Sequence, residues 1–510
     1  GDCGVVSNCV AIKPLETAFG RKREIDQSSC NKDFSCVEGF CPSFVTVHGA
    51  ELRKPAAARA AGADALAGAL RDLPEPATAV GSDYNILVTG IGGTGVVTIG
   101  ALLGMAAHLS RMGVSVLDQT GLAQKNGAVT SHVRVAATPD ALHGTRIPAA
   151  SADLVIGCDM VVAAGQEALA LYREGRTRAV VNDHVTPLAS FAIMPDQPQD
   201  ARPLIDTVRR AVGQDAADFV AAGRLAEALM GDAIFTNPFL LGYACQKGLL
   251  PFGRDALERA IRLNGVSVAA NLEAFGWGRV AAHAPERVLA VATPATRPAM
   301  RLPETLEEIV AHRRAHLTAY QNARYAARYE KLVRRVAEAE ARVAPGHDEL
   351  ARAVAASYAR LLAYKDEYEV ARLYSLPAFR ERLAATFETP QRLTVHLAPP
   401  ILSRPDPATG VAGKREFGPW MFTAFRVLAK LKALRGTPFD PFGRSADRRL
   451  ERRLIADYEA LAERMLRELT AGNRDIFAAL LSLPERIRGY GHVKERHVAE
   501  AEERRKELLA

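Results

Sequence analysis

Apolar residues follow two different patterns, one before about residue 300 and one after it. From Tyr84 onward, short apolar runs alternate with helical stretches, which is typical of the strands and helices of an α/β domain. Because helical stretches separate most of the strands, we expect a mainly parallel, doubly wound sheet, with helices dominating from about Asn237 to Trp277. The predicted strands are 85–89, 114–118, 129–135, 153–157 and 178–182.

After about Pro303 the strand pattern nearly vanishes. Residues 306–343 and 350–374 are predicted to be long, charged, amphipathic helices, and a further helix is predicted after Ser445. One strand, 392–397, is expected in the Pro- and Gly-rich break between these helices. The pattern therefore predicts a mostly α-helical C-terminal domain over residues 296–510.

The first 54 residues hold five of the seven cysteines and show little helical periodicity, apart from one short strand expected at 45–47. A segment this small cannot bury enough apolar surface to fold without a cross-link or a metal. Residues 55–83 are rich in Ala and Pro, which is typical of a linker with at most one weak helix. The predicted order is a cysteine segment (1–54), the linker (55–83), the α/β domain (84–295) and the helical domain.

Charge and hydropathy exclude several classes of protein. The net charge of +7 comes largely from arginines interleaved with acids, and no nucleic-acid motif accompanies it, so we expect no nucleic-acid binding. Acidic partners, such as a phosphorylated cofactor or a small acidic protein, fit this charge better. No apolar stretch approaches about 18 residues and no signal peptide is evident, so we expect a cytoplasmic protein that is not in a membrane. Because the chain opens without methionine, we also expect it to be part of something longer.

Three cysteines, Cys30, Cys36 and Cys41, lie in one short polar segment that ends on a Cys-Pro pair. With Cys9 they supply four thiolates, the number that a cubane iron–sulfur cluster needs, and Cys3 competes with Cys9 for the fourth place. Zinc sites usually contain pairs of cysteines two residues apart, which are missing here, and disulfides need an oxidising compartment. The segment therefore predicts a 4Fe-4S cluster, with zinc or disulfides as alternatives.

A glycine-rich turn, residues 90–95, follows the first strand of the α/β domain and opens a helix. Glycines at such a turn let backbone amides approach an anion at the positive end of the helix. Asp118 ends the next strand, where a Rossmann-like dinucleotide fold places its ribose-binding acid. The turn alone leaves three interpretations open: a site for NAD or FAD, a site for another anionic ligand, and a structural helix–sheet contact. It is not a P-loop, because no Lys-Ser/Thr pair follows the glycines.

The next loop, 120–127, lies at the carboxyl end of a strand, the edge of an α/β sheet where ligands usually bind. Its side chains Gln124 and Lys125, together with His132, are candidates for contacting a phosphate or a neighbouring domain. A solvated connecting loop is the alternative interpretation.

Several strings of residues resemble the fused indolepyruvate ferredoxin oxidoreductases, in order along nearly the whole chain. Residues 19–47, which include Cys30, Cys36 and Cys41, resemble the iron–sulfur segment of that family. Residues 88–98, 121–127 and 131–134 resemble the family's gamma-type domain, which pyruvate and other 2-oxoacid:ferredoxin oxidoreductases share. Residues 363–374, 414–420 and 484–494 resemble its C-terminal extension.

This resemblance implies oxidative decarboxylation of an aryl-2-oxoacid, such as indolepyruvate, with coenzyme A as co-substrate and ferredoxin as electron acceptor. It also implies that the α/β domain is a gamma-type module near the entry of coenzyme A, rather than an NAD site. The cluster ligands implied are Cys9, Cys30, Cys36 and Cys41, and the cofactor-binding candidates are Gly90, Gly92, Gly93, Gly95 and Lys125.

The half that would bind thiamine diphosphate and Mg is not found in this sequence, and no catalytic residue is identified. We therefore expect an incomplete catalyst whose partners are ferredoxin and thiamine-diphosphate domains, and which forms a homo-oligomer. The basic run 21–23 is a candidate for ferredoxin docking. An NAD- or FAD-binding reductase and a zinc-stapled, non-catalytic subunit remain the alternatives.

Overall fold

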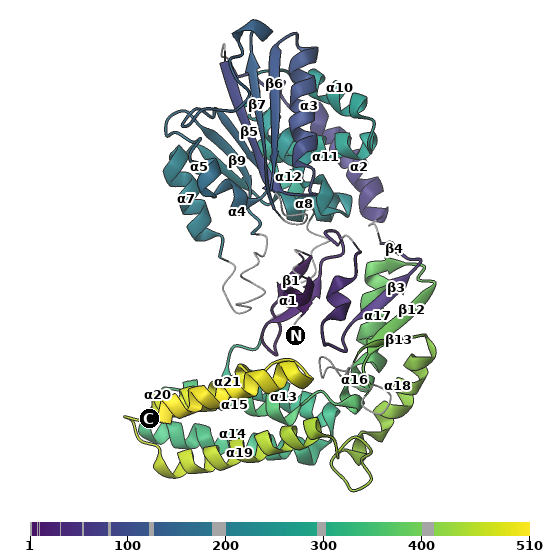
Figure 1. Ribbon diagram of the computed structural model, residues 1–510, viewed down its shortest axis with the longest axis vertical. Helices are drawn as coiled ribbons and strands as arrows, with labels where there is room; N and C mark the ends of the chain where they lie inside the picture. The colour runs from purple at the N-terminus through teal and green to yellow at the C-terminus, as the bar shows by residue number, and fades with distance from the viewer. Residues whose placement is uncertain are drawn as a thin grey trace.

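The chain is known from a computed structural model, which describes residues 3–7, 9, 11–30, 32–53, 56–79, 83–121, 127–185, 200–292, 302–399 and 413–509. An α/β domain lies at one end of the molecule and a helical domain at the other, with the N-terminal segment between them (Figure 1). None of the helices within these ranges is both long enough and apolar enough to cross a membrane.

The α/β domain is built on a six-stranded sheet with the order β10-β9-β8-β5-β7-β6. Strands β5, β8, β9 and β10 run parallel, whereas β7 is antiparallel to both of its neighbours. The mainly parallel sheet predicted from the sequence is therefore confirmed, and all five predicted strands are present. The bounds are β5 (Asp83–Ile91), β6 (Gly113–Thr120), β7 (Ala128–Ala136), β8 (Leu154–Gly157), β9 (Arg178–Asn182) and β10 (Ala217–Val220).

Helices cover both faces of this sheet, because successive side chains of a strand point to opposite faces. In β5, Ile86 and Val88 pack into the larger core beneath α3, α9, α10 and α11, while Leu87 packs into the core beneath α4, α5 and α7. The helices are α3 (Val96–Leu109), α4 (Met160–Ala163), α5 (Gln166–Leu169), α7 (Arg202–Val212), α8 (Ala222–Met230), α9 (Thr236–Gln246), α10 (Arg254–Asn264), α11 (Val268–His283) and α12 (Pro285–Ala292).

The segment that the composition predicts as a linker contains a 16-residue helix, α2 (Ala56–Arg71). Its Leu66 and Ala69 are buried in the larger core of the α/β domain. Ala-rich sequence favours a helix as readily as a flexible connection, and the apolar spacing of these two residues gives the helix a face to bury. The helix is therefore part of the α/β domain's packing.

The C-terminal domain is mostly helical, as predicted, but two of its long helices are interrupted. In the first stretch one helix ends at Tyr320 and Asn322 caps the next, its side chain accepting a hydrogen bond from the amide of Tyr325 (2.9 Å). In the second stretch one helix ends at Leu362 and Asp366 caps the next, its side chain accepting from the amide of Glu369 (2.8 Å). The helices are α13 (Leu306–Tyr320), α14 (Ala323–Val343), α15 (Glu349–Leu362), α16 (Glu367–Ser375), α17 (Pro377–Thr386), α18 (Trp420–Lys430), α19 (Ala446–Glu468), α20 (Arg474–Ser482) and α21 (Gly491–Leu509).

The N-terminal segment shares a sheet with the C-terminal domain. Strand β3 pairs with β12, which pairs with β13, and β4 pairs with β11. Side chains reinforce the first pairing, since Thr46 Oγ1 lies 2.8 Å from His396 Nε2. The bounds are α1 (Cys3–Ser7), β1 (Ile12–Leu15), β2 (Lys22–Ile25), the 3-10 helix η1 (Ser35–Glu38), β3 (Val45–His48), β4 (Glu51–Leu52), β11 (Phe387–Glu388), β12 (Arg392–Leu397) and β13 (Arg415–Phe417).

Candidate functional site

A cavity of about 2200 Å³ lies between the N-terminal segment and the helical domain, and five cysteines line it. These are Cys3, Cys9, Cys30, Cys36 and Cys41. All seven cysteines of the chain are free, so no disulfide staples the segment. The other two, Cys158 and Cys245, are buried in the α/β domain.

The five thiols lie close enough to influence one another's ionisation. The pKa of Cys36 is raised to about 11, chiefly by burial and then by the negative charges that Cys30, Cys3 and Cys9 carry as thiolates. Burial also raises the pKa of Cys3, with Cys41 adding to the rise and the Arg23 guanidinium opposing it. Electrostatic coupling therefore links Cys3 to Cys36 and Cys41, and it links Cys9 to Cys36.

The loop that carries Cys30 and Cys36 has an unusual backbone. Lys32 and Phe34 both have left-handed φ angles, 59° and 58°, which are uncommon for residues other than glycine. The amide of Lys32 donates to the Cys30 sulfur over 3.4 Å, and the amide of Cys41 donates to the Gly39 carbonyl over 2.8 Å. Amide hydrogen bonds to cysteine sulfur are one of the ways in which proteins tune iron–sulfur clusters.

Side chains of the helical domain hold this loop in place. The Tyr374 hydroxyl donates to the carbonyl of Pro42 (2.7 Å), and the Lys414 ammonium donates to the carbonyl of Val37 (2.8 Å). Burial raises the pKa of both Tyr374 and Tyr490, and the Cys41 thiolate is the second cause for each. The Cys41 thiol therefore faces two tyrosines of the helical domain.

The cavity cysteines are chemically suited to hold an iron–sulfur cluster, and they do not form a compact site for a single metal ion. Among the described residues, no three His, Cys, Asp or Glu side chains converge closely enough to hold one metal ion. Each thiolate of a cubane cluster binds a different iron, so its four ligands surround a larger group than one ion. Free thiols around a shared cavity, with an amide directed at one sulfur, match that requirement better than a compact zinc site.

The basic run 21–23 lines the cavity rather than forming one outward basic surface. Arg21 forms an ion pair with Glu16 over 2.5 Å, Arg23 faces Cys3, and Lys22 faces the helical domain. Adjacent residues of β2 point to opposite sides, which separates Lys22 from Arg23. This arrangement gives no support to the three residues acting together as a docking surface for ferredoxin.

The glycine turn connects β5 to α3 in the way that its sequence predicts. Gly93 and Gly95 have φ angles of 87° and 93°, and a Cβ on Gly90 would lie 2.6 Å from a methyl group of Val96. The Gly92 amide donates to the Gly127 carbonyl (2.9 Å), and Asn237 donates to the carbonyl of Thr94 (2.8 Å). Helix α3 and the turn are therefore held by contacts within the protein.

The other residues predicted at this edge of the sheet have different surroundings. His132 is buried, where its Nδ1 accepts from the amide of Ile147 (3.3 Å) and its Nε2 lies 3.1 Å from the side-chain oxygen of Gln119. Burial lowers its pKa, so His132 is a neutral interior group with both nitrogens engaged. Asp118 is exposed on β6. Gln124 and Lys125 lie outside the described residues.

Comparisons with known proteins match the two large domains separately. Residues 85–281 match the model of the pyruvate ferredoxin/flavodoxin oxidoreductase family, and residues 306–507 match a family of unknown function, DUF6537. The indolepyruvate oxidoreductase subunit IorB of Pyrococcus horikoshii is 30% identical over 206 residues, which are 39% of this chain and 96% of that protein. The chain belongs to this family of 2-oxoacid:ferredoxin oxidoreductase subunits.

Other known proteins are similar to the α/β domain as well. The IorB subunit of Thermococcus kodakarensis is 27% identical over 205 residues, covering 39% of this chain and 96% of that protein. Among solved structures, the pyruvate oxidoreductase subunit PORC of Thermotoga maritima is 17% identical, covers 39% of this chain and 96% of its own, and has a TM-score of 0.29. The family model and the two IorB subunits confirm the resemblance read from the sequence.

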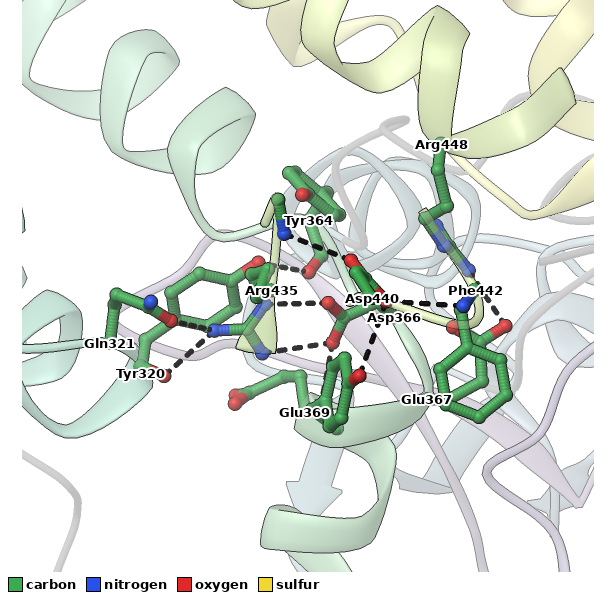
Figure 2. A network of polar contacts seen from close by, with 12 residues as sticks. Tyr320, Gln321, Tyr364, Asp366, Glu367, Glu369, Arg435, Asp440, Phe442 and Arg448 are labelled. Carbon is green, nitrogen blue, oxygen red and sulfur yellow. Dashed lines mark hydrogen bonds and ion pairs between the residues drawn. The ribbon is translucent and has the colours of Figure 1, made fainter. Parts of the chain in front are cut away.

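The helical domain of this oxidoreductase subunit contains a buried ionic network that the sequence did not reveal. The Arg435 guanidinium makes two hydrogen bonds to the Asp366 carboxylate, of 2.5 and 2.9 Å, and lies 3.7 Å from the centre of the Tyr320 ring (Figure 2). Tyr368 donates to Asp440 over 3.1 Å. Asp366 and Tyr368 belong to the string 363–374, which resembles the C-terminal extension of the family. Arg435 and Asp440 come from a connecting segment, where no periodic pattern distinguishes them.

Proposed function

We propose that this chain is the electron-transfer and gamma-domain part of an aryl-2-oxoacid:ferredoxin oxidoreductase. The supporting observation is that five free thiols line one cavity in a chain that belongs to this family. The proposed overall reaction converts a 2-oxoacid anion, coenzyme A and two oxidised ferredoxins into acyl-CoA, carbon dioxide, one proton and two reduced ferredoxins. Indolepyruvate is the proposed substrate, because the relatives are named as indolepyruvate oxidoreductase subunits.

A 4Fe-4S cluster is proposed on Cys30, Cys36 and Cys41, with either Cys3 or Cys9 as the fourth ligand. When bound, such a cluster accepts and releases electrons singly, which suits a reaction that yields two electrons to a one-electron acceptor. The Lys32 amide would stabilise negative charge on the Cys30 sulfur. Tyr374 and Lys414 would fix the cysteine loop against the helical domain.

The remaining cofactor and partner assignments extend the same proposal. Coenzyme A would be the co-substrate, and a separate part of the enzyme would bind thiamine diphosphate and Mg. Ferredoxin would accept the electrons. The working assembly would be a homo-oligomer. The cofactor candidates at the glycine edge of the sheet are Gly90, Gly92, Gly93, Gly95 and Lys125. The contacts of the glycine turn within the protein favour a turn that holds α3, and leave its exposed face available to a ligand.

Anaerobic purification and metal analysis test the proposal. We expect a brown protein with about four irons and four sulfides per chain. Cys36→Ser should lose most of that iron, whereas Cys245→Ala, which removes a buried thiol of the α/β domain, should retain it. A folded, colourless, iron-free chain would overturn the proposal, and stoichiometric zinc would favour the zinc-stapled subunit instead.

A further inference from the structure

Helix α18 presents apolar side chains to solvent at the outer edge of the helical domain (Figure 1). Trp420, Val427 and Leu431 are 61%, 59% and 44% exposed. They follow one another at spacings of seven and four residues, so they lie on one side of α18 and of the 3-10 helix η5 (Leu431–Leu434) that continues it. Exposed apolar side chains that gather on one surface are typical of a site where a partner binds.

The other side of α18 already packs within the chain. Met421 and Phe425 are buried in a core that they share with Tyr374 of α16 and Val395 of β12. The helix therefore has two apolar faces, of which the described part of the chain covers one. A helix that needed only to pack against its own domain would carry polar side chains on the second face.

The charged residues of α18 and η5 are all cationic. Residues 420–434 include three basic side chains and no acidic one. Lys432 turns back to the protein and donates to the carbonyl of Ala319 over 2.6 Å. Arg426 and Lys430 are exposed, and neither forms an ion pair within the ranges that the structure describes. The charge of this surface therefore favours an acidic partner.

The exposed face of α18 adjoins the cavity that the cysteines line. Trp420 is itself one of the residues that line this cavity, although most of its side chain is in solvent. Its ring meets that of Phe417 of β13 edge to face, with centroids 6.1 Å apart. Lys414, three residues before Phe417, donates to the carbonyl of Val37 in the cysteine loop. A protein bound at Trp420 would therefore lie beside the cysteine cavity.

We propose that the exposed face of α18, formed by Trp420, Val427, Leu431, Arg426 and Lys430, docks a small acidic electron-carrier protein. The apolar side chains would form the centre of the interface, and the two cations would form its charged rim. The proposal rests on the proposed function for the need of an external carrier. A second copy of the chain fits this face less well, because a two-fold contact would bring the same cations together.

Binding of a purified ferredoxin of net negative charge to the full chain, measured by calorimetry at low ionic strength, tests this surface. We expect saturable binding that weakens as salt is added. Lys430→Glu should weaken it about tenfold or more, and so should Trp420→Ala, because an aromatic anchor often dominates an interface. The matched control Lys506→Glu makes the same charge change on α21, at the opposite end of the helical domain (Figure 1), and should change binding less than about threefold.

Iron analysis and thermal unfolding of the same variants separate docking from the proposed function. Lys430→Glu and Trp420→Ala should keep the iron content and the unfolding temperature of the parent, since both side chains are exposed. An iron-free parent would overturn the proposed function alone, because this binding needs no turnover. An iron-loaded parent that does not bind the ferredoxin, or whose binding neither variant changes, would overturn the docking proposal. So would a Trp420→Ala variant that loses self-association in sedimentation and keeps ferredoxin binding.

Discussion

The hydroxyl of Tyr374 donates a 2.7 Å hydrogen bond to the carbonyl oxygen of Pro42, the residue that follows Cys41. A residue of α16 thus fixes the end of the cysteine loop, far from it in sequence. The same ring stacks on Phe425, with centroids 5.1 Å apart, so its position is set by the core of the helical domain. The geometry of the cysteine loop therefore depends on the folding of the C-terminal domain.

Replacing Tyr374 with Phe removes this bond but keeps the ring. We expect a loss of about 1–2 kcal/mol in stability, and faster release of bound iron to a chelator, because the carbonyl of Pro42, next to Cys41, loses its hydrogen bond. Tyr325→Phe is a matched control, since its hydroxyl donates to the carbonyl of Leu362 over 2.9 Å, away from the loop. Equal iron release in the two variants would show that Tyr374 has no special role at the cysteines.

The fourth cluster ligand can be assigned by comparing Cys3→Ser with Cys9→Ser. We expect one variant to lose iron and the other to keep it, because a cubane cluster takes four thiolates and the chain offers five at the cavity. Iron and sulfide analysis under anaerobic conditions makes the measurement. If both single variants keep their iron, the double variant must lose it; a fully loaded double variant would contradict the four-thiolate assignment.

The packing of α9 against α11 depends on two glycines. A Cβ on Gly242 would lie 1.9 Å from the carbonyl oxygen of Phe275, and one on Gly278 would lie 1.9 Å from that of Phe239. Gly242→Ala should therefore destabilise the α/β domain by about 3 kcal/mol or more, because neither backbone can yield. In Gly68→Ala, also within a helix, the new Cβ meets no atom within 4 Å, and a gain of up to about 1 kcal/mol is expected. Denaturant unfolding measures both, and a Gly242→Ala variant as stable as Gly68→Ala would refute the close approach.

The lowered pKa of Lys22, about 7, gives stability a defined dependence on pH. Between pH 7 and about 10 the unfolded chain holds the Lys22 proton while the folded chain has released it, so this group makes stability rise with pH. The charges that face it are those of Arg360, Lys365, Arg488 and Arg313.

Comparison with Lys22→Gln isolates this contribution from all other titrating groups. The free energy of unfolding of the parent relative to the variant should rise by no more than about 1.4 kcal/mol per pH unit across that window, and level off below pH 7. A difference that is constant with pH would show that Lys22 keeps an ordinary pKa.

Most of the α/β domain could be predicted because its strands are continuous apolar runs between turn residues. Strand β10 (Ala217–Val220) is not evident in the sequence because Asp218 interrupts its apolar residues, whereas the equally short β8 is a continuous apolar run. The breaks at Asn322 and Asp366 are made by single capping side chains inside otherwise periodic stretches. Such a break changes few apolar positions, so periodicity alone does not show it.

The cysteines of the candidate site could be predicted from their number and spacing in the sequence, but the side chains of the helical domain that face them could not. Tyr374, Lys414 and Tyr490 reach the cysteine loop because β3 pairs with β12, and no local signal announces a pairing over that separation. The run 21–23 appears as one basic patch in the sequence, yet strand geometry sends Lys22 and Arg23 to different sides.

The pairing of β3 with β12 also sets an order of events during synthesis. Thr46 and His396 are 350 residues apart, so at about 5–20 residues per second a ribosome needs roughly 20–70 s to make the second strand after the first. The described contacts of the sheet and its helices lie within residues 56–292, so this domain can fold during that interval. We expect the cysteine loop to stay without its contacts to β12 and the helical domain until that domain has left the ribosome. We therefore expect any metal centre at this loop to be assembled after translation.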